Sequence, residues 1–462
     1  MNRWHPNMIG ALLLGAVTLQ SCQADPSISI VKPDTPNQAI VPLQSQNQTV
    51  APTKTAAAVV VPRRLIVTLT QGTSLENWLA AARQSGVELV HDLSMNGRTT
   101  LDVTVKDSFD PIQTRRQLGE REDVQAVYTT RIARPHADPN DPYFGRQWGM
   151  QSAFTQATLA WERLNGVNQG QVAVAIIDTG IDPTHEEFTG RLLPGRNVGS
   201  NRFGRDKLDD IVGHGTVTAG IIGASANNGK GIAGVAPEVR MMPIKADNND
   251  NGFVLGDVIA GIKHALDNQT VGATRVRVIN MSLGENTGGV HPLYAEAIAY
   301  ARTRGVLVVA SSGNEGTSVV SSPANTPYCV AVGATTYHLN FELAYANSNY
   351  GPRLDLVAPG GGIFTTVPMT ASIIGGNLTP GYTYVSGTSE AAPFVAGVAA
   401  LVFAKYDPGH ASLASPERAA AMVDKVRQHL LASVDDLGPP GRDWTYGFGR
   451  INVDKALTPD RL

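Results

Sequence analysis

Three short, glycine-flanked segments of the chain carry an acid, a base and a nucleophile, in that order. Asp178 ends an apolar run and precedes Thr-Gly, His214 stands between two glycines, and Ser389 follows Gly-Thr. A buried carboxylate can orient an imidazole, which then takes the proton from a serine hydroxyl as that hydroxyl attacks a carbonyl carbon. The order acid, base, serine is one that convergent serine hydrolases use. Together the three segments predict a serine endopeptidase.

A fourth segment supplies a neutral hydrogen-bond donor. Asn314 leaves an apolar run and enters the loop Ser-Gly-Asn-Glu-Gly, and its side-chain amide suits the stabilisation of an oxyanion. Ser389 is expected at the positive end of an apolar helix over 391–402, with Pro393 in the first turn, so that its backbone N–H can face the same oxyanion. Taken singly, each of the four residues also fits a structural role in a turn, in the core or at a helix cap. Only their combination favours chemistry.

Apolar segments elsewhere in the chain must position these groups. Segments 172–177, 278–281, 305–309 and 330–332 are nearly continuous in apolar residues and alternate with helical stretches. This pattern predicts an α/β fold, with a parallel sheet covered by helices on both faces. Asp178 would then lie at the carboxyl edge, where open α/β sheets present their functional groups. A chain of 462 residues with 47 glycines suits such an enzyme.

A smaller α+β unit is predicted over residues 62–133. Strands are expected at 64–69, 87–93, 100–105 and 123–128, and helices at 74–83 and 110–118. The order β-α-β-β-α-β is that of a ferredoxin-like sandwich. The proline-containing stretch 131–142 is expected to be an exposed linker to the α/β domain, which is predicted over residues 139–457.

The first 60 residues predict export. Residues 1–22 resemble a signal peptide, because Arg3 precedes an apolar run at 8–19 that is too short to span a bilayer. Cys22 follows Leu-Gln-Ser, which resembles a bacterial lipobox with a lipid-anchored cysteine, and plain signal-peptide secretion is the alternative. Residues 23–60 are polar and proline-rich, and a flexible tether is expected there. Both alternatives predict a protein at the cell surface or outside the cell.

Composition argues against a nucleic-acid-binding protein and against a disulfide-rich protein. The 37 Lys and Arg residues do not outnumber the 40 Asp and Glu residues, so charge gives no reason to expect a nucleic-acid partner. Cys22 and Cys329 are the two cysteines of the sequence, which rules out a disulfide framework. Cys329 lies in an apolar run, and we expect a small buried hydrophobic residue there rather than a reactive thiol.

From about residue 139 to residue 457 the chain resembles the subtilase family, the subtilisin-like serine proteases. The matching motifs are Ile177-Asp-Thr-Gly-Ile181, His214-Gly-Thr216, Asn280-Met-Ser-Leu-Gly284, Ser312-Gly-Asn-Glu-Gly316, Gly387-Thr-Ser389 and Gly447-Phe-Gly-Arg-Ile-Asn452. The resemblance implies that Asp178 orients, that His214 is the base and that Ser389 attacks. Asn314 and the Ser389 N–H would form the oxyanion hole. Protein or peptide substrates, a monomer and chemistry without a cofactor are also implied.

The resemblance implies two stretches that contact the substrate. One is an edge strand that would pair with extended substrate backbone, and the other walls the pocket for the side chain before the cleaved bond. The strand would consist of Ser282, Leu283 and Gly284, and the wall of Ser311, Ser312 and Gly313. Small polar walls predict room for a sizeable side chain.

A structural calcium site is a further implication of the resemblance. Glu187, with Asn227 and Asn228 from a glycine-containing loop, would supply carboxylate and amide oxygens, which suit a hard cation. Lys230 in the same loop opposes cation binding, and a solvated surface turn is the alternative.

The unit over 62–133 resembles the inhibitory propeptide of the family. It would assist folding and block the cleft until self-cleavage near residues 130–138. The chain departs from its best-known relatives at Glu390, where they have methionine, and at Phe394, where they often have histidine. Glu390 is expected either to act electrostatically on His214 or to point into solvent. A non-catalytic binding protein on the same fold and a carboxyl-type Ser-Glu-Asp relative are the alternative functions, and retention of all four site residues favours the protease.

Overall fold

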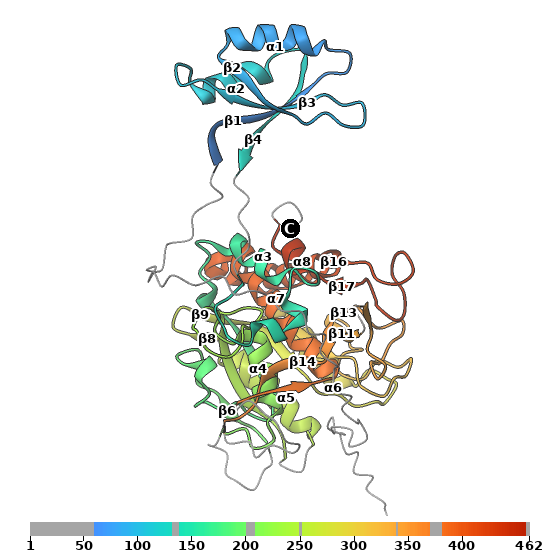
Figure 1. The fold of residues 1–462 in the computed structure, drawn as a ribbon. Coiled ribbons are helices and arrows are strands. Elements are labelled where there is room, and N and C mark those ends of the chain that lie inside the picture. The colour runs from blue at the N-terminus through green and yellow to red at the C-terminus, as the bar shows by residue number, and fades with distance from the viewer. Residues whose placement is uncertain are drawn as a thin grey trace, which may run out of the picture. The chain divides into compact units, whose positions relative to one another are not determined.

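The computed structural model describes residues 60–131, 138–199, 208–248, 252–338, 341–369 and 381–458. The predicted signal peptide, the anchor position Cys22 and the tether lie outside these ranges. The chain divides into two compact units (Figure 1). The smaller unit ends at Ala137, and Asp138 begins the main part of the larger unit. Each unit has its own hydrophobic core.

In the described residues, the smaller unit is an antiparallel sheet with the strand order β2-β3-β1-β4, accompanied by two helices. Its elements are β1 Val60–Leu69, α1 Leu75–Gln84, β2 Val87–Asp92, β3 Thr100–Val105, α2 Pro111–Gly119 and β4 Val124–Arg131. Side-chain caps fix the start of each helix. Ser74 Oγ accepts from the Asn77 backbone N–H, and Asp110 Oδ1 accepts from the Ile112 backbone N–H at 2.7 Å. Each predicted element is present within a few residues of its expected bounds.

The larger unit is built on an 11-stranded sheet within the described residues. Its main path runs β16-β17-β13-β11-β10-β9-β5-β7-β6, and the central pairs are parallel. The strands are β5 Val172–Asp178, β6 Arg196–Asn197, β7 Arg240–Lys245, β8 Thr270–Val271, β9 Thr274–Met281, β10 Leu307–Ser311, β11 Cys329–His338, β12 Phe341–Ala344, β13 Leu356–Gly361, β16 Val434–Asp435 and β17 Arg450–Ile451. A separate hairpin pairs β14 Ile363–Thr366 with β15 Tyr382–Val385. The predicted α/β fold is confirmed, and β7 and β13 are strands that the sequence analysis missed.

Helices cover both faces of this sheet (Figure 1). One core cluster joins the sheet to α4 and α7, and a second joins the other face to α5 and α6. The α-helices are α3 Ala157–Trp161, α4 His214–Gly223, α5 Leu255–Asp267, α6 Pro292–Thr303, α7 Thr388–Tyr406, α8 Pro416–Ala432 and α9 Val453–Ala456. Short 3₁₀ helices lie at Phe144–Arg146, Trp148–Met150, Glu162–Leu164, Gln169–Gln171, Glu186–Phe188 and Pro408–Ala414.

Helix α7 is the central helix of the larger unit. Among the described residues, α7 is the one helix that is long and apolar enough to cross a membrane. However, 94% of its apolar stretch is buried inside the unit. The helix begins at Thr388, so Pro393 is its sixth residue and not, as predicted, in the first turn. A proline there leaves the Ser389 carbonyl without its helical N–H partner. Ser282 Oγ donates to that carbonyl at 2.8 Å, so a distant segment satisfies it.

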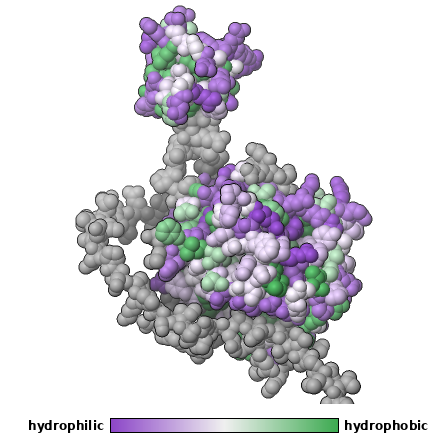
Figure 2. Space-filling view, turned by 90° about the vertical axis from the view of Figure 1, so that its right-hand side faces the viewer, coloured by the Kyte–Doolittle hydropathy of each residue, from purple (hydrophilic) through white to green (hydrophobic). Residues whose placement is uncertain are grey.

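Polar and apolar residues separate between surface and core. The face of the larger unit seen in Figure 2 is mainly hydrophilic or neutral, with small separated apolar patches. Cys329 is 2% exposed and belongs to the core cluster that contains α5 and α6. Burial raises the pKa of its thiol, which disfavours the reactive thiolate. The prediction of a buried hydrophobic residue at this position is confirmed.

Candidate active site

Asp178 and His214 meet at the carboxyl edge of the sheet. Asp178 is the last residue of β5, a strand that is buried along its whole length. His214 is the first residue of α4, and its Nδ1 atom lies 2.8 Å from Asp178 Oδ1. The Thr179 backbone N–H donates to the same carboxylate oxygen at 2.8 Å. A buried carboxylate in contact with one ring nitrogen fixes the imidazole orientation and directs the other nitrogen elsewhere.

The start of α4 is held by a second carboxylate, Asp210, which is 7% exposed. Asp210 Oδ1 accepts from Thr179 Oγ1 at 2.8 Å and from the Gly213 N–H at 2.7 Å. Its Oδ2 accepts from the Thr216 N–H at 2.8 Å and from Thr216 Oγ1 at 2.7 Å. Burial raises the pKa of Asp210, and these hydrogen bonds to the ionised form oppose that shift. Asp210 therefore joins the residue after Asp178 to the backbone on both sides of His214.

Ser389 lies in the first turn of α7 and is 2% exposed. Its Oγ donates to the Ser282 carbonyl at 3.3 Å. The first N–H groups of a helix have no intrahelical acceptor and lie at the positive end of its dipole. The Ser389 N–H belongs to this set, although the helix cap is Gly387 rather than Ser389.

Asn314 lies beside the same helix start, on the loop that follows β10. Its Oδ1 accepts from the Thr388 N–H at 2.8 Å and from Thr388 Oγ1 at 3.0 Å. These contacts orient the amide plane, so that Nδ2 is the donor end of the side chain. A Cβ atom added to Gly387 would lie 3.3 Å from Asn314 Nδ2, which places the amide close to the residues that precede Ser389. The structure thus brings Asn314 and Ser389 together.

Comparison with known proteins identifies the family. The model of the subtilase family matches residues 169–449. The chain belongs to the subtilase family. It is 37% identical over 322 residues to the thermophilic serine proteinase of Bacillus sp. (strain AK1), covering 69% of each chain. It is 34% identical to thermitase of Thermoactinomyces vulgaris, covering 69% of this chain and 99% of thermitase.

A solved structure is similar as well. Fervidolysin from Fervidobacterium pennivorans, a keratinolytic enzyme related to subtilisin, aligns with a TM-score of 0.58 at 26% identity, over 87% of this chain and 62% of fervidolysin. The subtilase resemblance seen in the sequence is therefore confirmed. The protein is a subtilisin-like serine endopeptidase, and subtilase chemistry requires no cofactor.

The first stretch of this subtilase that is predicted to contact substrate follows the end of strand β9. Strand β9 ends at Met281, where its pairing with β10 also ends, and residues 282–284 pair with no strand in the part of the chain that the structure describes. The bridge closest to them in the chain is between Glu285 and Ser322. Ser282 is 2% exposed because its hydroxyl bonds to α7. The segment predicted to pair with substrate thus has no strand partner among the described residues, and its Ser282 hydroxyl is bonded to α7.

The predicted pocket wall of the subtilase is mostly buried. Ser311 ends β10, and both Ser311 and Ser312 are buried. Ser312 Oγ donates to the Asn349 carbonyl at 3.0 Å, so the hydroxyl hydrogen already has a backbone acceptor. Gly313 has φ 108°, and a Cβ atom there would lie 2.3 Å from Asn349 Nδ2. Glycine is therefore required at this turn.

Glu390, the residue after Ser389, points inward rather than into solvent. Its side chain is 4% exposed, and burial raises its pKa to about 7. The His214 imidazolium lowers this pKa and the Asp178 carboxylate raises it further. The expectation of an electrostatic interaction with the site, rather than an outward orientation, therefore agrees with the structure.

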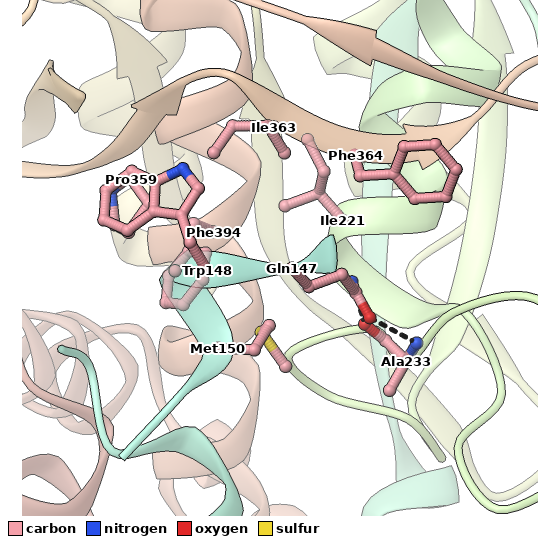
Figure 3. Close-up of a pocket in the computed structure, with 10 residues that line it drawn as sticks. Gln147, Trp148, Met150, Ile221, Ala233, Pro359, Ile363, Phe364 and Phe394 are labelled. Atoms are coloured by element: carbon pink, nitrogen blue, oxygen red, sulfur yellow. Dashed lines mark hydrogen bonds between the residues drawn. The ribbon is translucent and has the colours of Figure 1, made fainter. Parts of the chain in front are cut away.

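Phe394, on α7, is the second residue at which this subtilase differs from its best-known relatives. It lines a small apolar pocket. Figure 3 shows its ring beside Trp148, with Pro359, Met150 and Ile221 around the same space. Phe394 is 3% exposed. The substitution is accommodated because its neighbours are apolar, and it brings no titratable group to this position.

At the predicted calcium site of the subtilase, hydrogen-bond donors surround the Glu187 carboxylate. Glu187 is fully buried and accepts from the Ile232 N–H at 2.8 Å, from the Tyr382 hydroxyl at 3.0 Å and from Asn228 Nδ2 at 3.1 Å. The Asn228 side-chain oxygen accepts from the Lys230 N–H at 2.8 Å. Asn227 is exposed, and its side-chain oxygen accepts from a backbone N–H. As arranged, these residues do not fit a calcium ion, because Asn228 turns its amide nitrogen rather than its oxygen toward Glu187.

The stretch before this loop also differs from expectation. Residues 138–142 were predicted to be part of an exposed linker, but Asp141 is 4% exposed. It accepts from the backbone N–H groups of Asn227 and Asn228 at 2.8 and 3.2 Å. Within the described part of the chain there is no group of three or more His, Cys, Asp or Glu side chains that could hold a metal ion.

The sequence analysis missed two buried charged groups beside the site. One is Asp210, which lies four residues before His214. The Asp209-Asp210 pair ahead of the histidine motif is a weak sequence signal for it. The other is Lys245 at the end of β7, whose Nζ donates to the Thr179 carbonyl at 2.6 Å and lies 2.7 Å from Asp247 Oδ1. Nothing local in the sequence predicts the contact with Thr179, because the pairing of β5 with β7 brings the Thr179 carbonyl to Lys245.

Proposed function

We propose that this subtilase is an exported serine endopeptidase made as a self-processing precursor, and that Asp178, His214 and Ser389 are its catalytic triad. The observation that carries the proposal is the contact between the buried Asp178 carboxylate and His214 Nδ1, at 2.8 Å. This contact stabilises the imidazolium that forms when the histidine takes the serine proton.

The chemistry follows from these positions. His214 removes the proton from Ser389 Oγ as that oxygen attacks the substrate carbonyl carbon. The developing oxyanion accepts hydrogen bonds from Asn314 Nδ2 and from the Ser389 N–H, both of which are neutral donors held in place before reaction. The imidazolium then protonates the leaving amine, which departs and leaves an acyl-enzyme. Water activated by His214 hydrolyses the ester and restores Ser389.

Substrate binding is proposed for the segments on either side of the oxyanion donor. Residues 282–284 offer backbone beyond the end of β9 that is not paired within the sheet, which supports recognition of extended peptide. Residues 311–313 are proposed as the wall of the pocket for the side chain before the cleaved bond. Their small size supports a sizeable side chain there.

The smaller unit is proposed as an intramolecular inhibitor and folding aid that is removed by self-cleavage near residues 130–138. Its βαββαβ order and its own core support an independently folded module. The match to fervidolysin covers 87% of this chain, more than the larger unit alone contains, so it extends into the smaller unit. If Cys22 is lipid-anchored, cleavage would release the protease from the anchor, because the anchor precedes the cleaved region.

The decisive experiment compares the precursor with two serine variants. The wild-type precursor should shorten to the 130–138 region and hydrolyse casein, whereas Ser389→Ala should stay full length and inactive. Ser386→Ala is the matched control, because Ser386 is an exposed serine three residues earlier in the chain. N-terminal sequencing locates the cleaved bond. A wild-type chain that stays full length and leaves casein intact would show a non-catalytic member of the fold.

A further inference from the structure

The carboxyl group of Glu390 is buried without a hydrogen-bond partner for one of its oxygens. Its Oε2 has essentially no solvent exposure and makes no hydrogen bond within the described residues. Burying a polar oxygen in this way costs free energy, and the cost is much larger for a charged carboxylate than for a neutral carboxylic acid. Glu390 therefore occupies a place that disfavours its charged form.

This oxygen lies beside the proposed oxyanion donor. A Cβ atom added to Gly387 would lie 3.0 Å from Glu390 Oε2 and 3.3 Å from Asn314 Nδ2, so the carboxyl and the amide approach the same side of Gly387. The neighbouring elements contribute few other charges. Helix α4 contributes His214 and β5 contributes Asp178, whereas the loop after β10 contributes the neutral Asn314 amide.

The two charges that form during acylation respond to Glu390 in opposite ways. An ionised Glu390 attracts the imidazolium of His214 but repels the oxyanion. The imidazolium already has a counter-charge in contact, because Asp178 Oδ1 lies 2.8 Å from its Nδ1 atom. The proposed oxyanion donors, the Asn314 amide and the Ser389 N–H, are neutral and do not cancel a nearby negative charge. Because Oε2 approaches the Asn314 amide at Gly387, we infer that the repulsion of the oxyanion exceeds the attraction of the imidazolium, so that an ionised Glu390 raises the energy of the transition state.

We propose that Glu390 is an electrostatic positioning residue that supports catalysis as a neutral carboxylic acid, so that its ionisation weakens oxyanion stabilisation and sets the alkaline limit of activity. This inference rests on the proposed triad mechanism. Burial raises the pKa of Glu390 to about 7, which places the change within the working range of a serine protease.

The test measures kcat/KM for a chromogenic peptide anilide between pH 5 and pH 10. Mature wild-type enzyme is compared with Glu390→Gln, which is nearly isosteric and neutral at every pH, and with Glu390→Met. Glu296→Gln serves as control, because Glu296 is an exposed carboxylate on α6. Titration with phenylmethylsulfonyl fluoride counts competent sites, and thermal midpoints verify folding.

Wild type and Glu296→Gln should lose on the order of ten-fold in kcat/KM between pH 7 and pH 9. The reason is that the buried Glu390 carboxylate repels the oxyanion through a medium of low effective dielectric constant. Both Glu390 variants should keep a plateau over that range. Binding of a peptide boronate, which forms a negatively charged tetrahedral adduct, should weaken with pH in wild type and not in Glu390→Gln.

Identical alkaline profiles for wild type and folded Glu390→Gln or Glu390→Met would overturn the inference, and so would a pH-independent loss of activity in both variants. Failure of the proposed function gives a different result. In that case wild type itself binds no phenylmethylsulfonyl fluoride and cleaves no anilide, whatever residue stands at position 390.

Discussion

Replacement of Asp210 by asparagine tests whether a buried carboxylate positions His214, the proposed catalytic base. In an asparagine one of the two oxygens becomes an NH₂ group. Whichever oxygen is replaced, one backbone N–H, of Gly213 or of Thr216, then faces a donor instead of an acceptor. The two hydroxyl groups, on Thr179 and Thr216, can rotate and donate elsewhere, but the backbone N–H cannot.

The expected cost is about 3–5 kcal/mol in the free energy of unfolding. A buried N–H without an acceptor costs about 1–3 kcal/mol, and each remaining hydrogen bond loses about 1 kcal/mol when its acceptor is no longer charged. Because Gly213 directly precedes His214, the ring should also shift. A displacement of about 1 Å at a reacting group can lower the rate about 100-fold, so kcat/KM should fall by about 10–100-fold.

The stability assay is urea unfolding of Asp210→Asn in a Ser389→Ala background, where self-digestion does not contribute. The activity assay uses the same substitution in the active enzyme. Asp209→Asn is the matched control, because the neighbouring Asp209 side chain is exposed and should change stability by no more than about 0.5 kcal/mol. If Asp210→Asn lies within 1 kcal/mol of this control, the hydrogen bonds to Asp210 do not anchor α4 and the reasoning is refuted.

Four further predictions concern other parts of the larger unit. Because burial raises the pKa of Glu390 from 4.5 to about 7, urea unfolding should show wild type losing up to about 3 kcal/mol more stability than Glu390→Gln as pH rises from 4.5 to 7, while Glu187, whose pKa burial also raises to about 7, contributes equally to both proteins. If Asn314 is the oxyanion donor that we propose, Asn314→Ala should lower kcat by about 10²–10³, the scale established for an oxyanion-hole asparagine in subtilisin itself, with little change in KM in steady-state kinetics. Gly215→Ala should prevent accumulation of folded enzyme in expression trials, because its Cβ would lie 1.9 Å from the Gly180 carbonyl oxygen. EDTA should leave the melting temperature almost unchanged, because the Glu187 oxygens already have protein donors, and a fall of 10 °C or more would show that a bound metal ion supports this loop.

Local patterns in the sequence predicted most of the framework. Apolar runs marked β5, β9, β10 and β11, because a strand buried on both faces needs apolar residues at successive positions. Helix caps at Ser74 and Asp110 were predictable because a cap and the N–H groups it accepts from lie within three residues. Strands β7 and β13 contain proline, and β13 also contains glycine, so neither has the uniform apolar pattern that marks a strand.

By itself, the sequence determined the chemistry that is available: an acid, a base, a serine and an amide, each in a short motif whose neighbours fix the local turn. It could not determine how groups from distant segments satisfy one another. Only the tertiary structure shows that the Ser282 hydroxyl satisfies the carbonyl that Pro393 leaves without a partner, and that the Glu187 carboxylate accepts three hydrogen bonds from distant residues. It also decides that Glu390 is buried beside Asn314, the proposed oxyanion donor, instead of exposed. The physical reason is that burial and hydrogen-bond pairing depend on which segments the fold brings together, and residue spacing along the chain does not record that.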